Sequence, residues 1–334
     1  MRTRLVGTLL LLITLIFMST ACTTNKVVSP LNSNKQTAGS SSGESVPAKN
    51  TDSQDNNTLK TASFIDLNEG WLVTGHSILS TKDGGQHWSK IADISADVYD
   101  IDFVSLKLGW LATSDGLLKT EDGGSSWHNI GKPQGKAATR VQFADEKHGW
   151  IDVYHDWLDI EVGNPDYYYL RTTDGGENWT NIKIPDPDKY YRVAYFFISP
   201  SQGWLITGGQ PGAGQQLKKM YKTSDGGNSW SEISSTSLPP SEEDGLPSSG
   251  YVSDLYFLNE KYGWFTELRG QIYVTTDGGK DWVVVNKHPR DEMNMAKPYF
   301  INLKEGYVID SLSSSNASLL NSKDGGLSWK HVYP

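Results

Sequence analysis

The chain has 334 residues, including 12 Trp, 16 Tyr and 33 Gly but a single Cys, and its formal net charge is −9 at pH 7. Abundant aromatics and glycines favour many short strands joined by tight turns, and one cysteine excludes an intramolecular disulfide. An acidic surface repels phosphate backbones, so the composition argues against nucleic-acid binding.

Residues 1–22 are expected to form a signal peptide, and they resemble a bacterial lipoprotein signal. Arg2 and Arg4 precede an apolar run that is short for a membrane span. Cys22 follows small residues at the expected cleavage point, so we expect a lipid on Cys22 to hold the chain on the extracytoplasmic side of the bacterial cell membrane. The alternative is an ordinary cleaved signal followed by an incidental thiol.

Residues 23–58 are expected to be a disordered tether. They are rich in Ser, Asn, Thr and Lys and contain almost no apolar residues, so they cannot bury a core. A flexible chain of this length has a root-mean-square reach of roughly 30 to 36 Å. The folded domain is therefore expected to span 59–334.

One pattern recurs six times in that domain: a Phe, five variable residues, Gly-Trp, an apolar stretch, a second strand ending in Ser or Thr, one residue, Asp-Gly-Gly, two residues and Trp. Gly306-Tyr307 is the one departure from Gly-Trp. The Phe residues of the six copies are Phe64, Phe103, Phe143, Phe197, Phe257 and Phe300. The aspartates, which we expect to be structural, are Asp83, Asp122, Asp174, Asp225, Asp277 and Asp324.

Each copy predicts four short strands, A to D, which is typical of a propeller blade. We expect an all-β, six-bladed propeller of four-stranded antiparallel blades, with seven blades, one degenerate, as the alternative. The Asp can accept backbone N–H bonds across its turn, and the paired glycines permit positive φ. The following Trp is expected to cover the turn, so its replacement by Ala should cost about 3 to 5 kcal/mol.

The Ser/Thr-x-Asp-Gly-Gly-x-x-Trp turn resembles the Asp-box of bacterial neuraminidase repeats. Together with the Phe and Gly-Trp half, it resembles the propeller family named after the photosystem II assembly and stability factor, over essentially all of residues 59 to 334. That resemblance implies the fold. It implies little about function, because the same turn occurs in sialidases, sortilin-like receptors, glucanases and assembly factors.

Strand order places the A–B and C–D loops on one face and the B–C and D–A loops on the other. The first face has uniformly short loops, and we expect it to be inert. The long insertions fall on the second face, at 152–166, 207–216, 235–250 and 285–294. Variable loops on a rigid scaffold commonly carry binding.

An aromatic group around the longest insertion is the candidate partner or ligand surface, because exposed aromatic clusters are typical of such surfaces. The alternative is that the insertion folds back and buries these rings. The candidate residues are Tyr154, His155, Trp157, Tyr167, Tyr168, Tyr169, Tyr190, Tyr191 and Arg192.

A second candidate lies three residues before each repeat Phe, where the A strands are expected to line the central channel. Asp100, Arg140, Asp254 and Lys297 occupy this position, and we expect ion pairs between adjacent blades, Asp100 with Arg140 and Asp254 with Lys297. A glycosidase would use the two carboxyls as its acid and base. Their cationic neighbours disfavour that role, since they lower a carboxyl pKa.

The sequence therefore predicts a non-enzymatic, monomeric scaffold that binds a protein partner through its insertion-bearing face. It predicts no cofactor and no metal site, because the histidines lack ligand spacing and no phosphate loop is present. A carbohydrate-binding or glycoside-hydrolysing propeller is the alternative.

Overall fold

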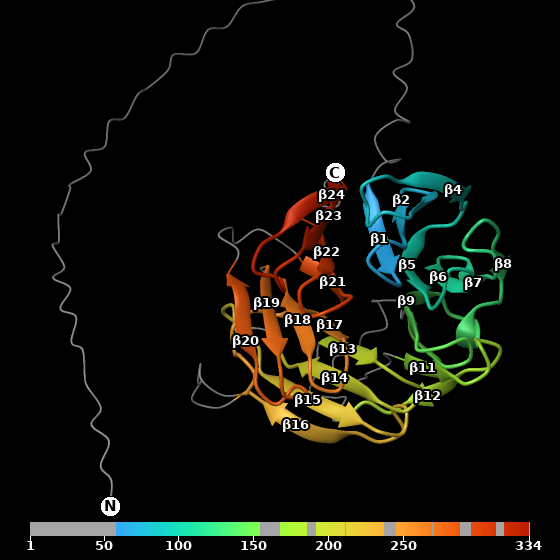
Figure 1. The fold of residues 1–334 in the computed structure, drawn as a ribbon. Coiled ribbons are helices and arrows are strands. Elements are labelled where there is room, and N and C mark those ends of the chain that lie inside the picture. Colours follow the sequence, from blue (N-terminus) through green and yellow to red (C-terminus); the bar gives the residue numbers. More distant parts are fainter. Residues whose placement is uncertain are drawn as a thin grey trace, which may run out of the picture. The chain divides into compact units, whose positions relative to one another are not determined.

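The computed structural model describes residues 58–153, 168–185, 192–210, 212–236, 245–268, 270–287, 295–311 and 317–333. These residues form six four-stranded sheets, in each of which the strands are neighbours in chain order. The sheets are the blades of a six-bladed β-propeller with the A strands innermost (Figure 1). The prediction of six blades is thus confirmed.

All neighbouring strands within a blade are antiparallel, as in the pairs β1 with β2 and β2 with β3. Within the described residues one 3-10 turn, η1 (Pro133–Gly135), precedes blade 3. The strands, blade by blade, are β1 (Leu59–Phe64), β2 (Gly70–Thr74), β3 (Ser77–Thr81), β4 (Ser89–Asp93); β5 (Val98–Phe103), β6 (Gly109–Thr113), β7 (Gly116–Thr120), β8 (His128–Asn129); β9 (Ala138–Phe143), β10 (Gly149–Val153), β11 (Tyr168–Thr172), β12 (Thr180–Ile182); β13 (Arg192–Phe197), β14 (Gly203–Gly208), β15 (Lys218–Thr223), β16 (Ser231–Ser235); β17 (Val252–Phe257), β18 (Gly263–Glu267), β19 (Gln271–Thr275), β20 (Val283–Lys287); β21 (Met295–Phe300), β22 (Gly306–Ser311), β23 (Ala317–Ser322) and β24 (Lys330–Tyr333).

The repeated Phe and Gly-Trp form the contact between blades. In blade 2 the Phe103 ring lies so close to Gly109 that an added Cβ would come within 2.6 Å of it, so only glycine fits there. The same Phe103 ring stacks on Trp71 of blade 1, with centroids 3.7 Å apart. Each Phe therefore joins its own second strand to the preceding blade.

This stack is repeated between every pair of neighbouring blades, including the last and the first. Tyr307 of blade 6 stacks on Phe64 of blade 1 with centroids 3.8 Å apart, so the ring closes through the one copy that carries Tyr. The remaining stacks are Trp110 with Phe143, Trp150 with Phe197, Trp204 with Phe257, and Trp264 with Phe300.

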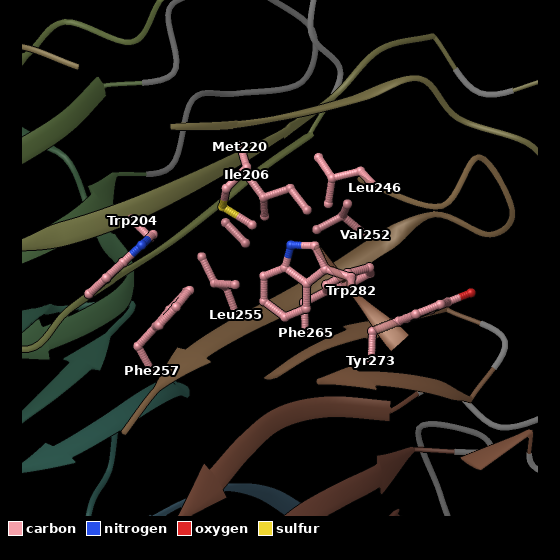
Figure 2. Packing of buried hydrophobic residues seen from close by; sticks show 11 residues of the cluster. Trp204, Ile206, Met220, Leu246, Val252, Leu255, Phe257, Phe265, Tyr273 and Trp282 are labelled. Atoms are coloured by element: carbon pink, nitrogen blue, oxygen red, sulfur yellow. The ribbon is translucent and has the colours of Figure 1, made fainter. Parts of the chain in front are cut away.

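The apolar core is divided among the blade interfaces. Between blades 4 and 5, Trp204, Met220 and Phe257 pack with Leu255 and Trp282 (Figure 2). A corresponding cluster joins blade 6 to blade 1, with Tyr307 and Leu319 from one and Leu59 and Phe64 from the other. Burial of apolar area between successive sheets stabilises the ring.

The C–D turns are tied by the Asp and the preceding Ser or Thr. In blade 2, Thr120 Oγ1 donates to Asp122 Oδ1 at 2.8 Å and accepts from the Gly124 N–H at 2.9 Å. Asp122 also accepts from the hydroxyl and backbone N–H of Ser126, and these bonds lower the pKa of Asp122 to about 2. The pKa is lowered at the equivalent aspartates too, Asp83, Asp174, Asp225, Asp277 and Asp324.

Connections differ between the two faces of the ring. The A–B connections have one length in all six blades, and so do the C–D connections. All variation in length lies in the B–C and D–A connections, which share the opposite face. Hydrogen bonds tie each A–B loop to its own C–D turn, as from the Gly123 N–H to Lys107 O at 2.9 Å.

Candidate functional site

The A strands surround the channel with two tiers of side chains. The upper tier consists of the residues that stand three positions before the repeat Phe in each blade. They are, from blade 1 to blade 6, Thr61, Asp100, Arg140, Ala194, Asp254 and Lys297. Asp100 and Asp254 are almost completely buried. Both carboxylates accept the N–H of the following residue at 2.8 Å, and Asp100 also accepts from the Val141 N–H of blade 3.

The four charges form two ion pairs, but the expected partners were wrong. Arg140 of blade 3 pairs with Asp254 of blade 5 at 2.7 Å, and Lys297 of blade 6 pairs with Asp100 of blade 2. Each pair passes over one intervening blade. The residues on those blades are the small Thr61 and Ala194, which leave room for the long cationic side chains to reach across.

The lower tier, one residue before the Phe, connects adjacent A strands, which have no ladder of their own between blades. Ser63 Oγ accepts from the Phe103 N–H at 3.0 Å, and Asp102 Oδ2 accepts from the Phe143 N–H at 2.7 Å. Gln142 bonds both the N–H and the carbonyl of Phe197. These polar side chains hydrogen-bond one A strand to the next and so stabilise the ring.

Side chains of both tiers line a cavity of about 30 Å³, among them Asp102, Arg140, Asp254, Tyr256 and Lys297. Burial raises the pKa of Asp102 to about 7, although a backbone hydrogen bond from Phe143 and the charge of Arg140 oppose the shift. Burial lowers the pKa of Lys297, while its contact with Asp100 favours the ammonium form. A cavity of this volume can hold water but is far below the roughly 300 Å³ of a typical ligand pocket.

The predicted aromatic surface falls mostly beyond the residues that the structure describes. This applies to Tyr154, His155, Trp157, Tyr167, Tyr190 and Tyr191. Tyr168 begins β11 and Arg192 begins β13, and their side chains lie outside the description.

Tyr169 was predicted to belong to that exposed surface, and this prediction was wrong. It is 5% exposed and belongs to the core between blades 3 and 4, where its ring meets Tyr195 edge to face. Successive side chains of a strand point to opposite faces, so a tyrosine run that enters β11 cannot remain wholly exposed.

Sequence reasoning missed a buried ion pair beneath the insertion-bearing face. Lys218 Nζ lies 3.1 Å from Glu267 Oε1, and neither side chain is exposed. The same ammonium donates to the carbonyls of Pro247 and Ser249, in the connection that leads into blade 5. Alignment of the repeats could have found it, because Glu267 stands where blade 1 has Thr74.

The described residues contain no group of three or more His, Cys, Asp or Glu side chains arranged to bind a metal ion. None of the described helical structure has the length and apolar character needed to cross a bilayer.

A family model described as photosynthesis system II assembly factor YCF48 matches residues 41–131, which include blades 1 and 2. A search of curated proteins found no match. Among solved structures, the chain is similar to "YCF48 bound to D1 peptide", with 19% identity, 83% of this chain and 81% of that chain covered, and a TM-score of 0.50.

Two further similar structures have other activities in their titles. One is the GH74 xyloglucanase from Xanthomonas campestris, with 13% identity, 84% of this chain and 48% of that chain covered, and a TM-score of 0.52. The other is the calcium-binding protein regucalcin from Agrobacterium tumefaciens, with 9% identity, 77% and 84% covered, and a TM-score of 0.51. These likenesses show the fold, and over residues 41–131 the chain also resembles the photosystem II assembly factor in sequence.

Proposed function

We propose that this protein is a non-enzymatic scaffold that binds a protein partner through its insertion-bearing face. The observation that carries the proposal is the distribution of loops: connections vary in length on one face only. Length variation confined to one face of a rigid ring is what a binding surface built from loops requires. The similar YCF48 structure, whose title records a bound D1 peptide, supports a peptide or protein as the class of partner.

The buried Lys218 supports the same proposal. Its ammonium holds the carbonyls of Pro247 and Ser249, and the Gln216 amide donates to Gly209 O and accepts from the Val252 N–H. Two connections of the insertion-bearing face are thereby fixed against each other before any partner binds. A preorganised surface loses less conformational entropy on association.

The channel argues against hydrolysis as the activity. Its two predicted acid and base carboxyls, Asp100 and Asp254, are each bound to a cation, and the cavity of about 30 Å³ is far smaller than a typical ligand pocket. A glycosidase would need one carboxyl with a raised pKa beside space for a sugar. The carbohydrate-active alternative is tested by a glycan array and a hydrolase screen, and turnover abolished by Asp100→Asn or Asp254→Asn would overturn the scaffold proposal.

Crosslinking in cells tests the binding face directly. A photo-crosslinking amino acid is placed at Leu217 or at residue 157, both in B–C connections, and at Asn228 as the control in the C–D turn of blade 4. We expect one defined protein adduct from the first two positions and none from Asn228. Adducts of equal yield from Asn228, or none from either loop position, would contradict the proposal.

We further propose that a lipid on Cys22 anchors the protein on the extracytoplasmic side of the bacterial membrane, with 23–58 as a tether. The apolar run ahead of the single cysteine supports this reading. A clickable fatty acid should label the wild-type chain and leave Cys22→Ser unlabelled. Equal labelling of both chains, or recovery of the wild type in the soluble fraction, would count against the anchor.

A further inference from the structure

Four exposed leucines lie on the face that was expected to be inert. Leu303, Leu67 and Leu106 are each the third residue after the repeat Phe, in the A–B turns of blades 6, 1 and 2, and are 47%, 37% and 54% exposed. Leu327, in the C–D turn of blade 6, is 63% exposed. Single exposed leucines are ordinary, but equivalent positions in consecutive blades form a set. We call these four residues the leucine arc.

Contacts between neighbouring blades link the turns that carry the arc. Blades 6 and 1 are joined where the Tyr307 hydroxyl donates to Gly84 O at 3.2 Å and lies 3.5 Å from Leu67 O. Blades 1 and 2 are joined by the Trp71 indole N–H, which donates to Gly123 O at 2.9 Å. The A–B and C–D turns of these blades therefore adjoin around this part of the rim.

The leucines are not required for the turns that carry them. In blade 1 the turn is tied by Asp66 Oδ1, which accepts the N–H groups of the second and third residues that follow it. Asp145 ties the equivalent turn of blade 3 in the same way, yet the residue after it is Glu146. Blades 4 and 5 carry Pro200 and Glu260 at this position. The leucine side chain is thus free for another use.

Charge around the arc selects the kind of partner. On the A–B and C–D turns of these three blades, carboxylates exceed ammonium groups by seven to four. The Asp-box carboxylates among them are ionised at physiological pH, and hydrogen bonds within their own turns lower their pKa further. An apolar surface with excess negative charge is electrostatically complementary to a cationic amphipathic segment and repels anionic lipid.

We infer that the leucine arc is a docking surface for a cationic amphipathic segment of a partner protein. Aliphatic or aromatic side chains of the segment cover the leucines, and its Lys or Arg residues face the surrounding carboxylates. The arc lies opposite the insertion-bearing face, so this inference does not depend on the proposed function. The crosslinking test of the insertion-bearing face and the peptide-binding test of the leucine arc can fail separately.

The test measures the binding of three labelled 15-residue peptides to the full chain by fluorescence anisotropy. One peptide is built from Leu and Lys in helical amphipathic order, the second replaces Lys by Glu, and the third replaces Leu by Ser. We expect saturable binding of the Leu-Lys peptide only. The triple variant Leu67→Ser, Leu106→Ser and Leu303→Ser should weaken it about tenfold or more, because apolar contact is lost at three positions.

The matched control changes the same turn position in two other blades, Glu146→Ser and Glu260→Ser, and should leave affinity within about threefold. The control should unfold at the wild-type temperature, since Glu146 and Glu260 are exposed. The triple variant should keep one cooperative transition, since Leu67, Leu106 and Leu303 are 37%, 54% and 47% exposed. Equal affinity in wild type and triple variant, or preference for the Leu-Glu peptide, would overturn the inference. So would tighter binding to phosphatidylglycerol vesicles than to the Leu-Lys peptide, or a dimer that the triple variant abolishes.

Discussion

At the scale of single residues, the tryptophans of the repeat are not equivalent. The Gly-Trp indoles are almost fully buried between blades, with Trp110 and Trp150 at 0% exposure, whereas Trp127 and most of the other C–D turn indoles keep part of their surface accessible. From the sequence, a loss of about 3 to 5 kcal/mol was expected at the turn tryptophans. The structure indicates that the Gly-Trp position contributes more, because full burial and stacking on the next blade coincide there.

Trp110→Ala should therefore lower the free energy of unfolding by about 3 to 5 kcal/mol, through the lost burial and the cavity that remains. Trp127→Ala is the matched control, and we expect a clearly smaller loss because this ring is partly exposed and meets Phe103 only by its edge. Chemical denaturation of both variants decides between them. Equal losses, or a larger loss in Trp127→Ala, would contradict the assignment.

Asp102 should make stability depend on pH. Its pKa is about 7 in the folded protein and near 3.8 in the unfolded chain, so the folded state binds this proton more tightly between those values. The contribution of Asp102 to stability therefore falls as pH rises from about 4 to about 7. Asp102→Asn keeps an oxygen for the Phe143 N–H, and it should remove this fall. Melting temperatures of both proteins between pH 4 and 8 test it, and parallel curves would reject the shift.

At the scale of elements, the Asp-box turn is the unit most completely predictable from sequence. Each residue acts within its own turn: the Thr or Ser bonds the Asp, the Asp bonds the following N–H groups, and Gly123 needs its φ of +80°. Such local roles are visible in a linear pattern. Contacts that depend on distances around the ring are not visible in a linear pattern. For this reason the predicted ion-pair partners of Arg140 and Lys297 were wrong.

Acid should loosen these turns. The pKa of Asp174 is about 2 in the folded state against 3.8 unfolded, so its contribution to stability is present above about pH 4 and is lost as pH falls toward 2. All six turns act in the same direction. Proton uptake measured on unfolding across this range should decrease in Asp174→Asn relative to wild type. An unchanged uptake would show that the turn does not hold the carboxylate ionised.

The Lys218–Glu267 pair should behave as a unit. Lys218→Met leaves the Glu267 carboxyl buried without its cation, which should cost about 3 to 5 kcal/mol. The double variant Lys218→Met, Glu267→Leu should recover a large part of that loss, because no uncompensated charge remains. Denaturation of the two single variants and the double variant gives the coupling energy. Additive losses would mean that the two residues act separately.

At the scale of the whole molecule, blade number and strand order could be predicted because each blade contains one recognisable copy of the repeat. The sequence did not show which side chains are exposed and therefore which surfaces can bind a partner. Tyr169 was assigned to an exposed cluster and is buried, while the leucine arc lies on a face that its short loops made appear inert. The repeat pattern predicts the structure that all six blades share. It does not predict the exposed residues that differ from blade to blade, and these determine binding.

The central claim is that six blades form one closed ring, in which Tyr307 on Phe64 completes the series of stacks. Calorimetry of the wild type and Tyr307→Ala, with Trp264→Ala as the matched stack of an interior interface, tests this directly. We predict one cooperative transition in the wild type and a shift to lower temperature in Tyr307→Ala comparable to that in Trp264→Ala. Separate transitions in the wild type, or an unshifted Tyr307→Ala, would contradict a closed ring.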